Sequence, residues 1–564
     1  MELAFEIVFG IIAFILINII IYDKYIQRKH QLLINYPLIG RLRYFFEALR
    51  EPFRQYFGDE TFYESKDKVD WVYKAANDLA GYASFSPTQP QANPKFLMKH
   101  SNSPLNDFEV NQEFEVTFGK DREIPYKAKT IIARSAMSDG AISPEGTRAF
   151  TKASYDGNFP INTGEGSLTT NFFFTHKDHN DSCMDRVKIE GLNKTIFKVI
   201  KFFFNNYIAI KYFRKQLLNS KEADTYIFDQ DAFLFFRPNW NAPLENFPEN
   251  VPEDMPDIIF QMSSGLFGVR DINGDFDDER YQKTMKFCKM TEIKLAQGAK
   301  QTGGKLAAEK VSDSIAYYRG VVAHNPVVSP NRFPYAKSIP ELFDFVAKLQ
   351  KLSKKPVGIK IVISSREGIE DFAKEMKKRK DNKTAGIPDF ISIDGGDGGS
   401  ATAPLFLMDS VGFHVKDAIH IADNILKEYG VRKKVKLVAA SKILTPDDIA
   451  VVMALGADFI YLARGFMMSA GCIRARMCSG HGSHQCPVGL ATQDKNLRAS
   501  YLVYKHANKA VNYHKNLLAG VRTILAVMGL KDVKDLNKEH LTFIDKNGFI
   551  YTNINRYLDK KINT

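Results

Sequence analysis

Three of the five cysteines in this chain lie close together in one short stretch. Cys472, Cys478 and Cys486 stand in GCIRARMCSGHGSHQCPVG, with Pro and Gly soon after the last of them. Thiolates favour zinc and iron–sulfur centres. His481 and His484 belong to the same stretch, so a zinc site of mixed ligands competes with an iron–sulfur cluster, and three unrelated thiols are the plain alternative. The spacing predicts a metal centre and leaves the metal open.

Small polar and basic clusters, QGAK, DGGDGG and ARG, end apolar runs within residues 130–466. Most of the runs are rich in Ile, Val and Phe, and they begin at Thr130, Phe159, Ile258, Glu292, Val357, Phe390, Val435 and Phe459. Helical periodicity follows several of them. Eight such units predict an α/β fold, a (β/α)8 TIM barrel. The strands of a barrel carry function at their carboxyl ends, so these clusters predict an active site on one rim.

The chain of 564 residues is longer than a barrel requires, which is about 250 residues. We predict the barrel over residues 121–500, with an inserted subdomain at about 167–256 between its second and third strands, because that connection far exceeds a usual βα loop. Residues 24–120 are expected to form an N-terminal helical extension. Residues 501–564 are expected to form a C-terminal helical tail.

The N-terminal run from Leu3 to Tyr22 is almost wholly apolar and long enough to cross a ~30 Å hydrocarbon core. A cleaved signal peptide competes, but the run lacks a basic leader and a small-residue cleavage site. We therefore predict a single-pass membrane anchor at residues 1–23. Basic residues follow the run and place the catalytic body in the cytoplasm by the positive-inside rule; they are Lys24, Arg28, Lys29, Arg41 and Arg43.

The net charge of +12 does not indicate nucleic acid, because no basic stretch is interleaved with stacking aromatics. The basic run at 374–383 is typical of the solvated end of a surface helix. We therefore predict no nucleic-acid partner. Five cysteines in so long a chain suit a reducing compartment and argue against a disulfide framework.

Residues from about 120 to 536 resemble the FMN-binding synthase domain of glutamate synthases, especially the glutaminase-free branch. The matching motifs are GAISPEG, INTGEGS, SSGLFGV, EIKLAQGAK, ISIDGGDGGSATAP, GADFIYLARGFMMSAGC and CPVGLATQD. The resemblance implies FMN in the barrel mouth with 2-oxoglutarate over its ring. Reduced FMN would give hydride to the imine of 2-oxoglutarate and ammonia, forming L-glutamate in nitrogen assimilation. A 3Fe-4S cluster on Cys472, Cys478 and Cys486 would feed electrons to the flavin.

The substrate residues that the resemblance implies are cationic and polar. Lys300 and Arg319 fall on positions that bind 2-oxoglutarate in the family, and an arginine can hold a carboxylate through two bonds. Gln297 and Glu165 match positions that line the same site. Lys305 stands where glutamate synthases usually carry Gln, and this extra cation could strengthen dicarboxylate binding or shift the substrate preference.

The flavin residues that the resemblance implies lie at the strand ends. Lys360 would place a cation at the flavin ring, where positive charge stabilises the anionic reduced form. A lysine in a buried strand is otherwise costly unless paired. The remaining cofactor residues are Ser135, Ala136, Met137, Asp397, Gly398, Gly399, Ser400, Ser441, Lys442, Arg464 and Gly465. Loops after strands seven and eight of barrels commonly bind phosphate.

Two further departures from the family pattern stand out. Cys478 and Cys486 enclose seven residues, where the family has four, although loop closure makes three extra residues inexpensive. The seventh strand ends in ASKILTP, where better-known enzymes have a Gly-Gly turn. Side chains there narrow the approach of a phosphate, but Ser441 and Lys442 can themselves bind one.

The sequence has no G-x-G-x-x-G after a strand in a dinucleotide-binding context, so direct use of a nicotinamide cofactor is not expected. Electrons would come from a ferredoxin-like protein, a reductase subunit or a membrane carrier. With no amino-terminal nucleophilic cysteine, ammonia would be free or come from glutamine hydrolysis elsewhere. We therefore predict a glutamate synthase-like oxidoreductase. The alternatives are an FMN oxidoreductase acting on another amine or 2-oxo acid, such as an N-substituted glutamate, and a non-catalytic membrane-tethered scaffold.

Overall fold

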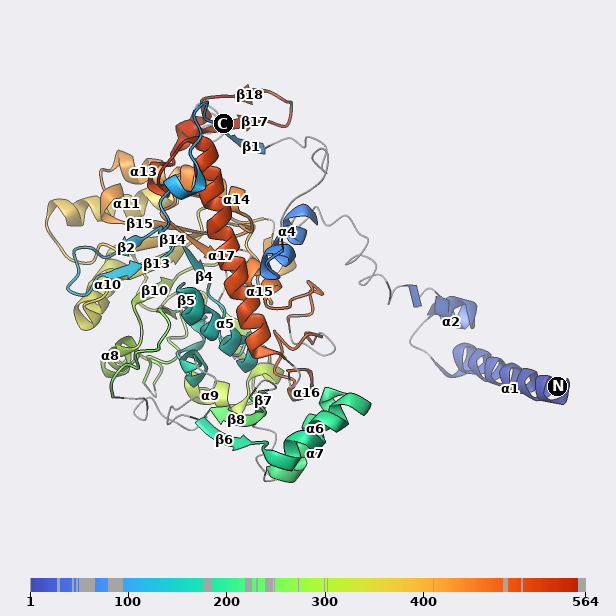
Figure 1. Cartoon of the computed structure of the whole chain (residues 1–564). Helices are drawn as coiled ribbons and strands as arrows, with labels where there is room; N and C mark the ends of the chain where they lie inside the picture. The colour runs from blue at the N-terminus through green and yellow to red at the C-terminus, as the bar shows by residue number, and fades with distance from the viewer. Residues whose placement is uncertain are drawn as a thin grey trace. The chain divides into compact units, whose positions relative to one another are not determined.

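The computed structural model describes residues 2–555 apart from a set of gaps, and Figure 1 shows the chain. The longer gaps are 50–65, 80–94, 176–183, 219–225, 239–246 and 480–484; the shorter ones are 28–30, 43–44, 47–48, 230–231, 248, 272, 299, 302, 409 and 499–500. The chain divides into two compact units, Met1–Lys66 and Asp67–Thr564.

Eight parallel strands close into a barrel, as the sequence predicts. They are β4 (Ile132–Arg134), β5 (Ile161–Asn162), β9 (Ile258–Met262), β10 (Met290–Lys294), β13 (Val357–Ile361), β14 (Phe390–Asp394), β15 (Lys436–Ala440) and β16 (Phe459–Leu462). Neighbours in the sequence are neighbours in the barrel, and β16 pairs with β4 to close it. Seven of the eight strands are buried throughout, which explains their continuous apolar runs.

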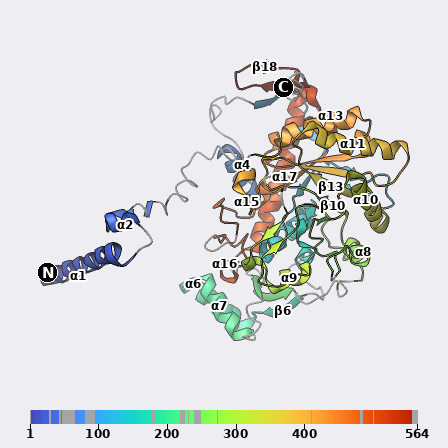
Figure 2. The same ribbon diagram turned by 180° about the vertical axis from the view of Figure 1, so that it is seen from behind.

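Helices cover the outside of the barrel (Figures 1 and 2). They include α5 (Pro144–Gly157), α8 (Asp278–Lys286), α10 (Ile339–Ser353), α11 (Arg366–Asp381), α13 (Val415–Glu428), α14 (Pro446–Ala454) and the long α17 (Val503–Met528). Side chains of Ser143, Ser338 and Ser365 cap the first turns of α5, α10 and α11 by accepting bonds from backbone N–H groups. The helix α17 packs on α5, α14 and α15 (Arg464–Ser469), so the C-terminal region braces the barrel.

The connection from β5 to β9 contains the insertion. After the short turns η3 (Gly164–Gly166) and η4 (Thr170–Phe173) come β6 (Met184–Lys188), α6 (Gly191–Phe203), α7 (Asn206–Leu217), β7 (Ile227–Asp229) and β8 (Leu234–Pro238). The three strands form an antiparallel sheet in the order β6-β8-β7. This region has its own hydrophobic cluster, separate from that of the barrel.

The flanking segments are less helical than expected. Before the barrel, α4 (Lys66–Ala76) is a helix, but β1 (Lys95–Met98) and β2 (Val116–Phe118) are strands. After α17 come β17 (Leu541–Ile544) and β18 (Ile550–Tyr551), which make a sheet with β1. The partners β1 and β17 are more than 400 residues apart in the sequence, so local periodicity could not reveal the pairing.

In the N-terminal unit, α1 (Glu2–Ile21) continues into a π-helical turn, η1 (Tyr22–Ile26), and α2 (Gln31–Asn35) follows. Within the described residues, one helix, Glu6–Ile26, is long and apolar enough to span a membrane. At its end Asp23 forms an ion pair with Arg41, at 2.6 Å. Of the basic residues predicted to follow the span, Arg28, Lys29 and Arg43 lie outside the described residues.

Candidate functional site

Glu165 stands at the centre of the charged groups at the carboxyl end of the barrel. It lies in η3, directly after β5, and its carboxylate accepts a hydrogen bond from Lys294 Nζ at 3.2 Å. Burial by itself raises the pKa of Glu165, but Lys294 and Arg319 outweigh it and lower the pKa to about 2. Glu165 also acts on the pKa values of Lys300 and Lys360. Lys294 therefore pairs with this carboxylate, and Arg319, Lys300 and Lys360 lie near enough for its charge to act on their pKa values.

Lys300 follows β10 and lies buried, with its Nζ donating to Thr402 Oγ1 at 2.9 Å. Thr402 Oγ1 in turn donates to the carbonyl oxygen of Lys305 at 3.5 Å, so the predicted pair of lysines meets at one threonine. Burial lowers the pKa of Lys300 to about 8, and the charges of Lys294 and Lys305 add to the effect. In the described part of the chain, no carboxylate forms a salt bridge with Lys300. The ammonium group has charge available for an anionic ligand.

Arg319 ends α9 (Asp313–Arg319) and is 4% exposed. Its Nη2 donates to Ser138 Oγ at 3.3 Å and to the Asp139 carbonyl at 3.4 Å, while the guanidinium lies 5.4 Å from the centre of the Phe267 ring. Among the described groups, its Nε has no hydrogen-bond partner. Burial lowers the pKa of Arg319, and Glu165 and Asp139 oppose the shift. The guanidinium is held in place and retains an unused donor.

Lys360, near the carboxyl end of β13, is buried and pairs with Asp394 at 3.2 Å. Burial disfavours its charge, but Asp394 and Glu292 outweigh that effect and raise the pKa of Lys360. Glu292 accepts bonds from Asn162 at 3.0 Å and from Gln261 at 2.6 Å, and also from the hydroxyl of Ser392. The barrel thus encloses a polar layer in which the expected flavin lysine is paired, as its burial requires.

The loops after β10 and β14 touch through glycines. A Cβ on Gly298 would lie 2.1 Å from the Gly395 carbonyl oxygen and 3.1 Å from Gly398 N, so only glycine fits there. Gln297 Nε2 donates to the Gly399 carbonyl at 3.3 Å. A Cβ on Gly399 would lie 3.1 Å from Arg464 Nη2. The structure therefore brings Gln297, Gly398, Gly399 and Arg464 together, as predicted for one rim.

Asp397 connects this loop to the end of β15. Its carboxylate accepts from Ser441 Oγ at 2.9 Å and lies 3.3 Å from His414 Nδ1. Burial raises the pKa of Asp397, but His414, Ser441 and Lys442 outweigh burial and lower it. Ser441 and Lys442 have φ of 114° and 44°, a conformation that glycine adopts readily and other residues do not. The turn therefore places two side chains at positions whose backbone conformation favours glycine.

The segment Ser135–Met137 follows β4, next to β16, where Ser135 N donates to the Leu462 carbonyl at 2.9 Å. Arg134 holds the segment by donating from Nη1 to the carbonyls of Ser135 (2.8 Å), Met137 (3.1 Å) and Asn162 (2.8 Å). Ala136 lies between these anchored carbonyls.

Two other predicted cofactor residues have local structural contacts. Gly465 packs closely on α17, because a Cβ there would lie 2.0 Å from the Tyr513 hydroxyl oxygen. Ser400 accepts a bond from Thr402 N at 3.5 Å.

Cys472, Cys478 and Cys486 lie near enough for their charges to interact. Burial, with Cys478 and Cys486, raises the pKa of Cys472 to about 11, and burial, with Cys486, raises the pKa of Cys478. Lys310 lies beside them and donates to the carbonyls of Ala141, Cys478 and Ala491. Among the residues that the structure describes, however, no three His, Cys, Asp or Glu side chains are grouped to hold a metal ion. His481 and His484 lie outside the described residues. The described geometry does not provide a finished metal site, and the predicted cluster stays a prediction.

Comparison with known proteins places this site in a family. The conserved region in glutamate synthase matches residues 80–531, which is most of the chain. The chain belongs to the glutamate synthase family. That family region contains the whole barrel, the insertion and the charged groups around Glu165.

Individual relatives within the family match about half of the chain. The glutamate synthase large subunit-like protein YerD of Bacillus subtilis is 40% identical over 296 residues, covering 52% of this chain and 55% of YerD. The archaeal-type glutamate synthase [NADPH] of Thermotoga neapolitana is 30% identical over 307 residues, covering 54% and 56%. The chain thus spans little more than half the length of these glutamate synthase relatives.

Solved structures outside this family give only a weak likeness. A mutant flavocytochrome b2 with benzoylformate aligns over 91% of this chain and 90% of its own, at 12% identity and a TM-score of 0.41. So distant a likeness says nothing about the site. The barrel itself is established by the strand pairing above.

Several residues of this family member's site were missed by sequence reasoning. Lys294 pairs with Glu165, Asp394 pairs with Lys360, and Thr402 joins Lys300 to Lys305. The sequence could have indicated Lys294 and Asp394, since a charged residue at the end of a buried strand needs a partner of opposite charge. Nothing in the sequence indicated Thr402, because its contacts depend on how two loops meet.

Proposed function

We propose that this chain is an FMN-dependent, glutamate synthase-like oxidoreductase that converts 2-oxoglutarate and ammonia into L-glutamate. The observation that supports it best is the pair Lys300 and Arg319, two buried cations held around Glu165 and not neutralised by salt bridges in the described part of the chain. A doubly anionic keto acid would supply the negative charge that pairs with these two cations. Family membership supports the same substrate class.

The residues present fit a flavin. Lys360 offers a buried cation inside the barrel, and Gly398 and Gly399 leave backbone accessible beside Arg464. Backbone N–H groups of this kind, with Ser441 and Lys442, suit a phosphate. Ser135, Ala136 and Met137 would lie beside the ring. When bound in its two-electron reduced form, FMN supplies hydride to the imine carbon.

The chain's own residues bind and orient the substrate in this proposal. Arg319 would hold one carboxylate through paired N–H donors and Lys300 the other. Glu165 and Gln297 line the same space, and ionised Glu165 keeps nearby cations in a fixed arrangement. The overall change consumes 2-oxoglutarate, ammonia, two electrons and two protons, and yields L-glutamate and water.

The decisive experiment measures flavin and product together. The purified full chain should contain FMN that denaturation releases. Under anaerobic conditions, photoreduced protein should be reoxidised by 2-oxoglutarate with ammonia, with one glutamate formed per flavin. A flavin-free chain that FMN cannot reconstitute would end the proposal, and so would reduced flavin that is unaffected by both substrates together.

A second candidate keeps the flavin and changes the amine. Lys305 is exposed on β11 (Lys305–Leu306) close enough to lower the pKa of Lys300, and it adds a cation at the rim. Such a site could accept another amine or 2-oxo acid, as in an N-substituted glutamate. Faster reoxidation by 2-oxoglutarate with methylamine than with ammonia would favour this candidate. A tethered scaffold would show neither reaction, and its 2-oxoglutarate binding would be absent.

We also propose that Glu6–Ile26 anchors the chain in a membrane with a cytoplasmic catalytic body. The helix has the length and apolarity of a membrane span, and a signal sequence is the competing interpretation.

We further propose that Cys472, Cys478 and Cys486 hold a 3Fe-4S cluster. Iron and acid-labile sulfide analysis tests the cluster, with a single zinc per chain as the competing result. A ferredoxin or a reductase subunit would supply the electrons.

A further inference from the structure

The helices α6 and α7, residues 191–217, expose an unusual amount of apolar surface; we call this pair the hairpin. Phe202, Phe203 and Phe204, at its tip, are 82%, 71% and 69% exposed. Leu192, Ile196, Val199 and Phe203 are exposed at spacings of four, three and four residues, which puts them on one face of α6. The hairpin thus presents an apolar stripe to its surroundings.

This stripe is not needed for folding the insertion. A separate set of side chains, including Phe197, Ile210 and Phe213, already packs the hairpin against β7 and β8. The exposed stripe is therefore a second apolar face of α6, in addition to the one the fold buries. On α7, Tyr207, Ile208 and Tyr212 are also exposed. Contiguous exposed apolar surface of this kind marks a site of interaction.

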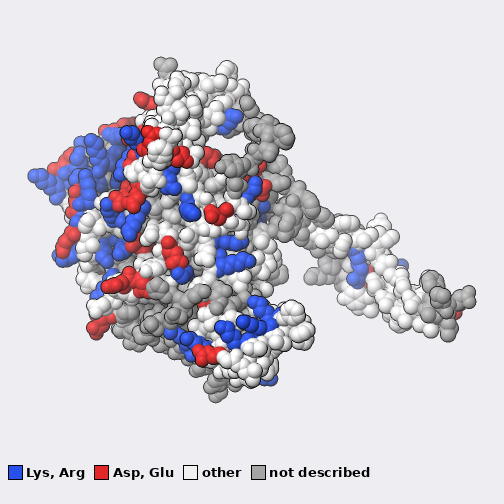
Figure 3. Space-filling model, in the orientation of Figure 1, with Lys and Arg blue, Asp and Glu red and all other residues white. Residues whose placement is uncertain are grey.

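The charge of the hairpin indicates what the partner is. Residues 191–217 contain six Lys or Arg and no Asp or Glu. Lys201, Lys211 and Lys215 are exposed, the last two among the exposed tyrosines of α7. In Figure 3, which has the orientation of Figure 1, blue Lys and Arg side chains gather in the region of α6 and α7, with white uncharged side chains beside them and a small red patch. A second copy of the chain, bound symmetrically, would bring like charges together, whereas an anionic lipid surface complements them.

We propose that the hairpin binds the surface of an anionic membrane, with its apolar stripe in the lipid and its lysines at the headgroups. Helices with Lys on one face and Phe or Leu on another lie in the membrane interface in this manner. Basic residues near such a surface each contribute to the attraction. The hairpin joins β6 to β7 in the connection from β5 to β9, and Glu165 lies in the same connection. Membrane contact would therefore turn a defined side of the catalytic unit to the lipid.

The test uses the full chain, reconstituted into vesicles, with Phe203→Trp as a reporter of lipid contact. With about 30% phosphatidylglycerol, lipids brominated in the acyl chain should quench the added fluorescence by about half. In vesicles of phosphatidylcholine alone, the quenching should fall several-fold. Phe108→Trp is the matched control, because Phe108 is 80% exposed and lies in η2 (Asp107–Glu109), which packs on α17. The parent chain, with Trp71 and Trp240, gives the background.

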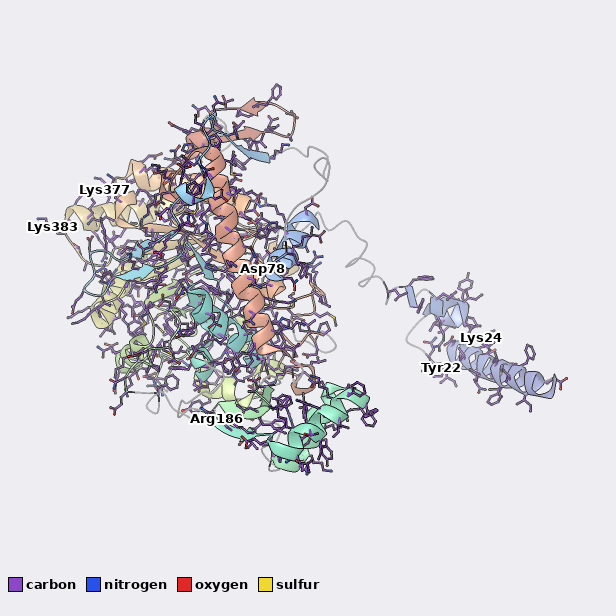
Figure 4. All side chains as sticks on the ribbon, viewed as in Figure 1. Tyr22, Lys24, Asp78, Arg186, Lys377 and Lys383 are labelled. Atoms are coloured by element: carbon purple, nitrogen blue, oxygen red, sulfur yellow. The ribbon has the colours of Figure 1, made fainter. Side chains whose placement is uncertain are left out.

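Charge reversal separates the hairpin from general basic charge. The triple change Lys201→Glu, Lys211→Glu and Lys215→Glu should abolish the anionic-lipid quenching. The same change at Lys377, Lys378 and Lys383, on and just after α11, should leave it intact; Figure 4 labels two of these lysines on the opposite side of the catalytic unit. Three results would overturn the proposal. The first is quenching of the Phe203→Trp variant no greater than that of the parent chain, and the second is an equal loss of quenching in both triple variants. The third is a change in the fluorescence of the Phe203→Trp variant that depends on protein concentration and not on lipid.

Discussion

The barrel mouth and the hairpin both concentrate basic side chains, but they differ in how deeply those side chains are buried. Lys300 and Lys360 are each 4% exposed and have shifted pKa values, downward for the first and upward for the second. The lysines of the hairpin are mostly exposed and belong to a segment without a single carboxylate. The two regions therefore use the same residue types, and they differ in burial and in the presence of nearby carboxylates.

Burial decides how a cation is used in each region. A buried ammonium must be compensated, so each one in the barrel mouth either pairs with a carboxylate or keeps its charge for a small anionic ligand. An exposed ammonium loses little hydration and acts by attraction to an extended surface, which salt screens. In the proposals above, the first arrangement would bind a small anionic molecule and the second would bind an anionic surface.

Disrupting the buried ion pair should have the strongest consequence. Lys360→Met leaves Asp394 and Glu292 buried without their cation, which should lower the free energy of unfolding by about 3–5 kcal/mol. Chemical denaturation of the flavin-free chain measures this. Lys201→Met, the matched change in the hairpin, should leave the denaturation midpoint unchanged. Adding Asp394→Asn to Lys360→Met should restore part of the loss; equal midpoints for the two single variants would remove the distinction between the regions.

Removal of a free buried cation should affect binding more than folding. Lys300→Met is expected to weaken 2-oxoglutarate binding by about 10- to 100-fold, since a hydrogen bond to a charged group contributes about 1.5–3 kcal/mol. Arg319→Lys should also weaken it, because lysine cannot hold a carboxylate through two bonds. Titration calorimetry measures both. Lys377→Met serves as the control, and full affinity in the Lys300 variant would show that the dicarboxylate binds elsewhere.

The pH dependence should distinguish the two regions next. The pKa of Lys300 is lowered to about 8, so its ammonium is charged below that value and neutral above it. Affinity for 2-oxoglutarate should therefore fall as the pH rises from 7 to 9, by several-fold. Lys300→Met should flatten the profile in this window. Lipid binding by the hairpin should stay constant over the same range, and a parallel decline in both would point to a global change.

Backbone strain at the rim should give the weakest of these effects. Lys442 has φ of 44°, and a non-glycine residue in this region costs about 1–2 kcal/mol. Lys442→Gly should raise the stability of the flavin-free chain by about 0.5 kcal/mol, since the added flexibility of glycine when unfolded offsets part of the gain. Lys377→Gly, inside α11, should lower it by about 1 kcal/mol. Loss of stability in both variants would contradict the strain at Lys442.

Much of the fold could be predicted because a closed parallel barrel buries each strand on both faces. The apolar runs at Ile258, Val357 and Phe390 match β9, β13 and β14. The flanks could not be predicted in the same way. Pairing of β1 with β17 joins segments from the two ends of the unit Asp67–Thr564, and neither strand has a local pattern that identifies its partner.

The residues of the candidate site also divide into those that the sequence predicted and those that it did not. Lys300, Arg319 and Glu165 could be named from motifs, and the structure brings the two cations close to the carboxylate of Glu165. Lys294, Asp394 and Thr402 could not be selected, because their importance comes from side chains that other strands bring to them. The thiols at 472, 478 and 486 were found by spacing, but spacing does not fix how a loop closes around a metal.

The barrel, the apolar N-terminal helix, the insertion and the family could all be read from the order of residues, because periodicity, length and motifs are local properties of the chain. Which charges are paired and which remain available was decided only when the chain folded. That outcome depends on burial and on distances between strands far apart in sequence, and electrostatic energy changes steeply with both.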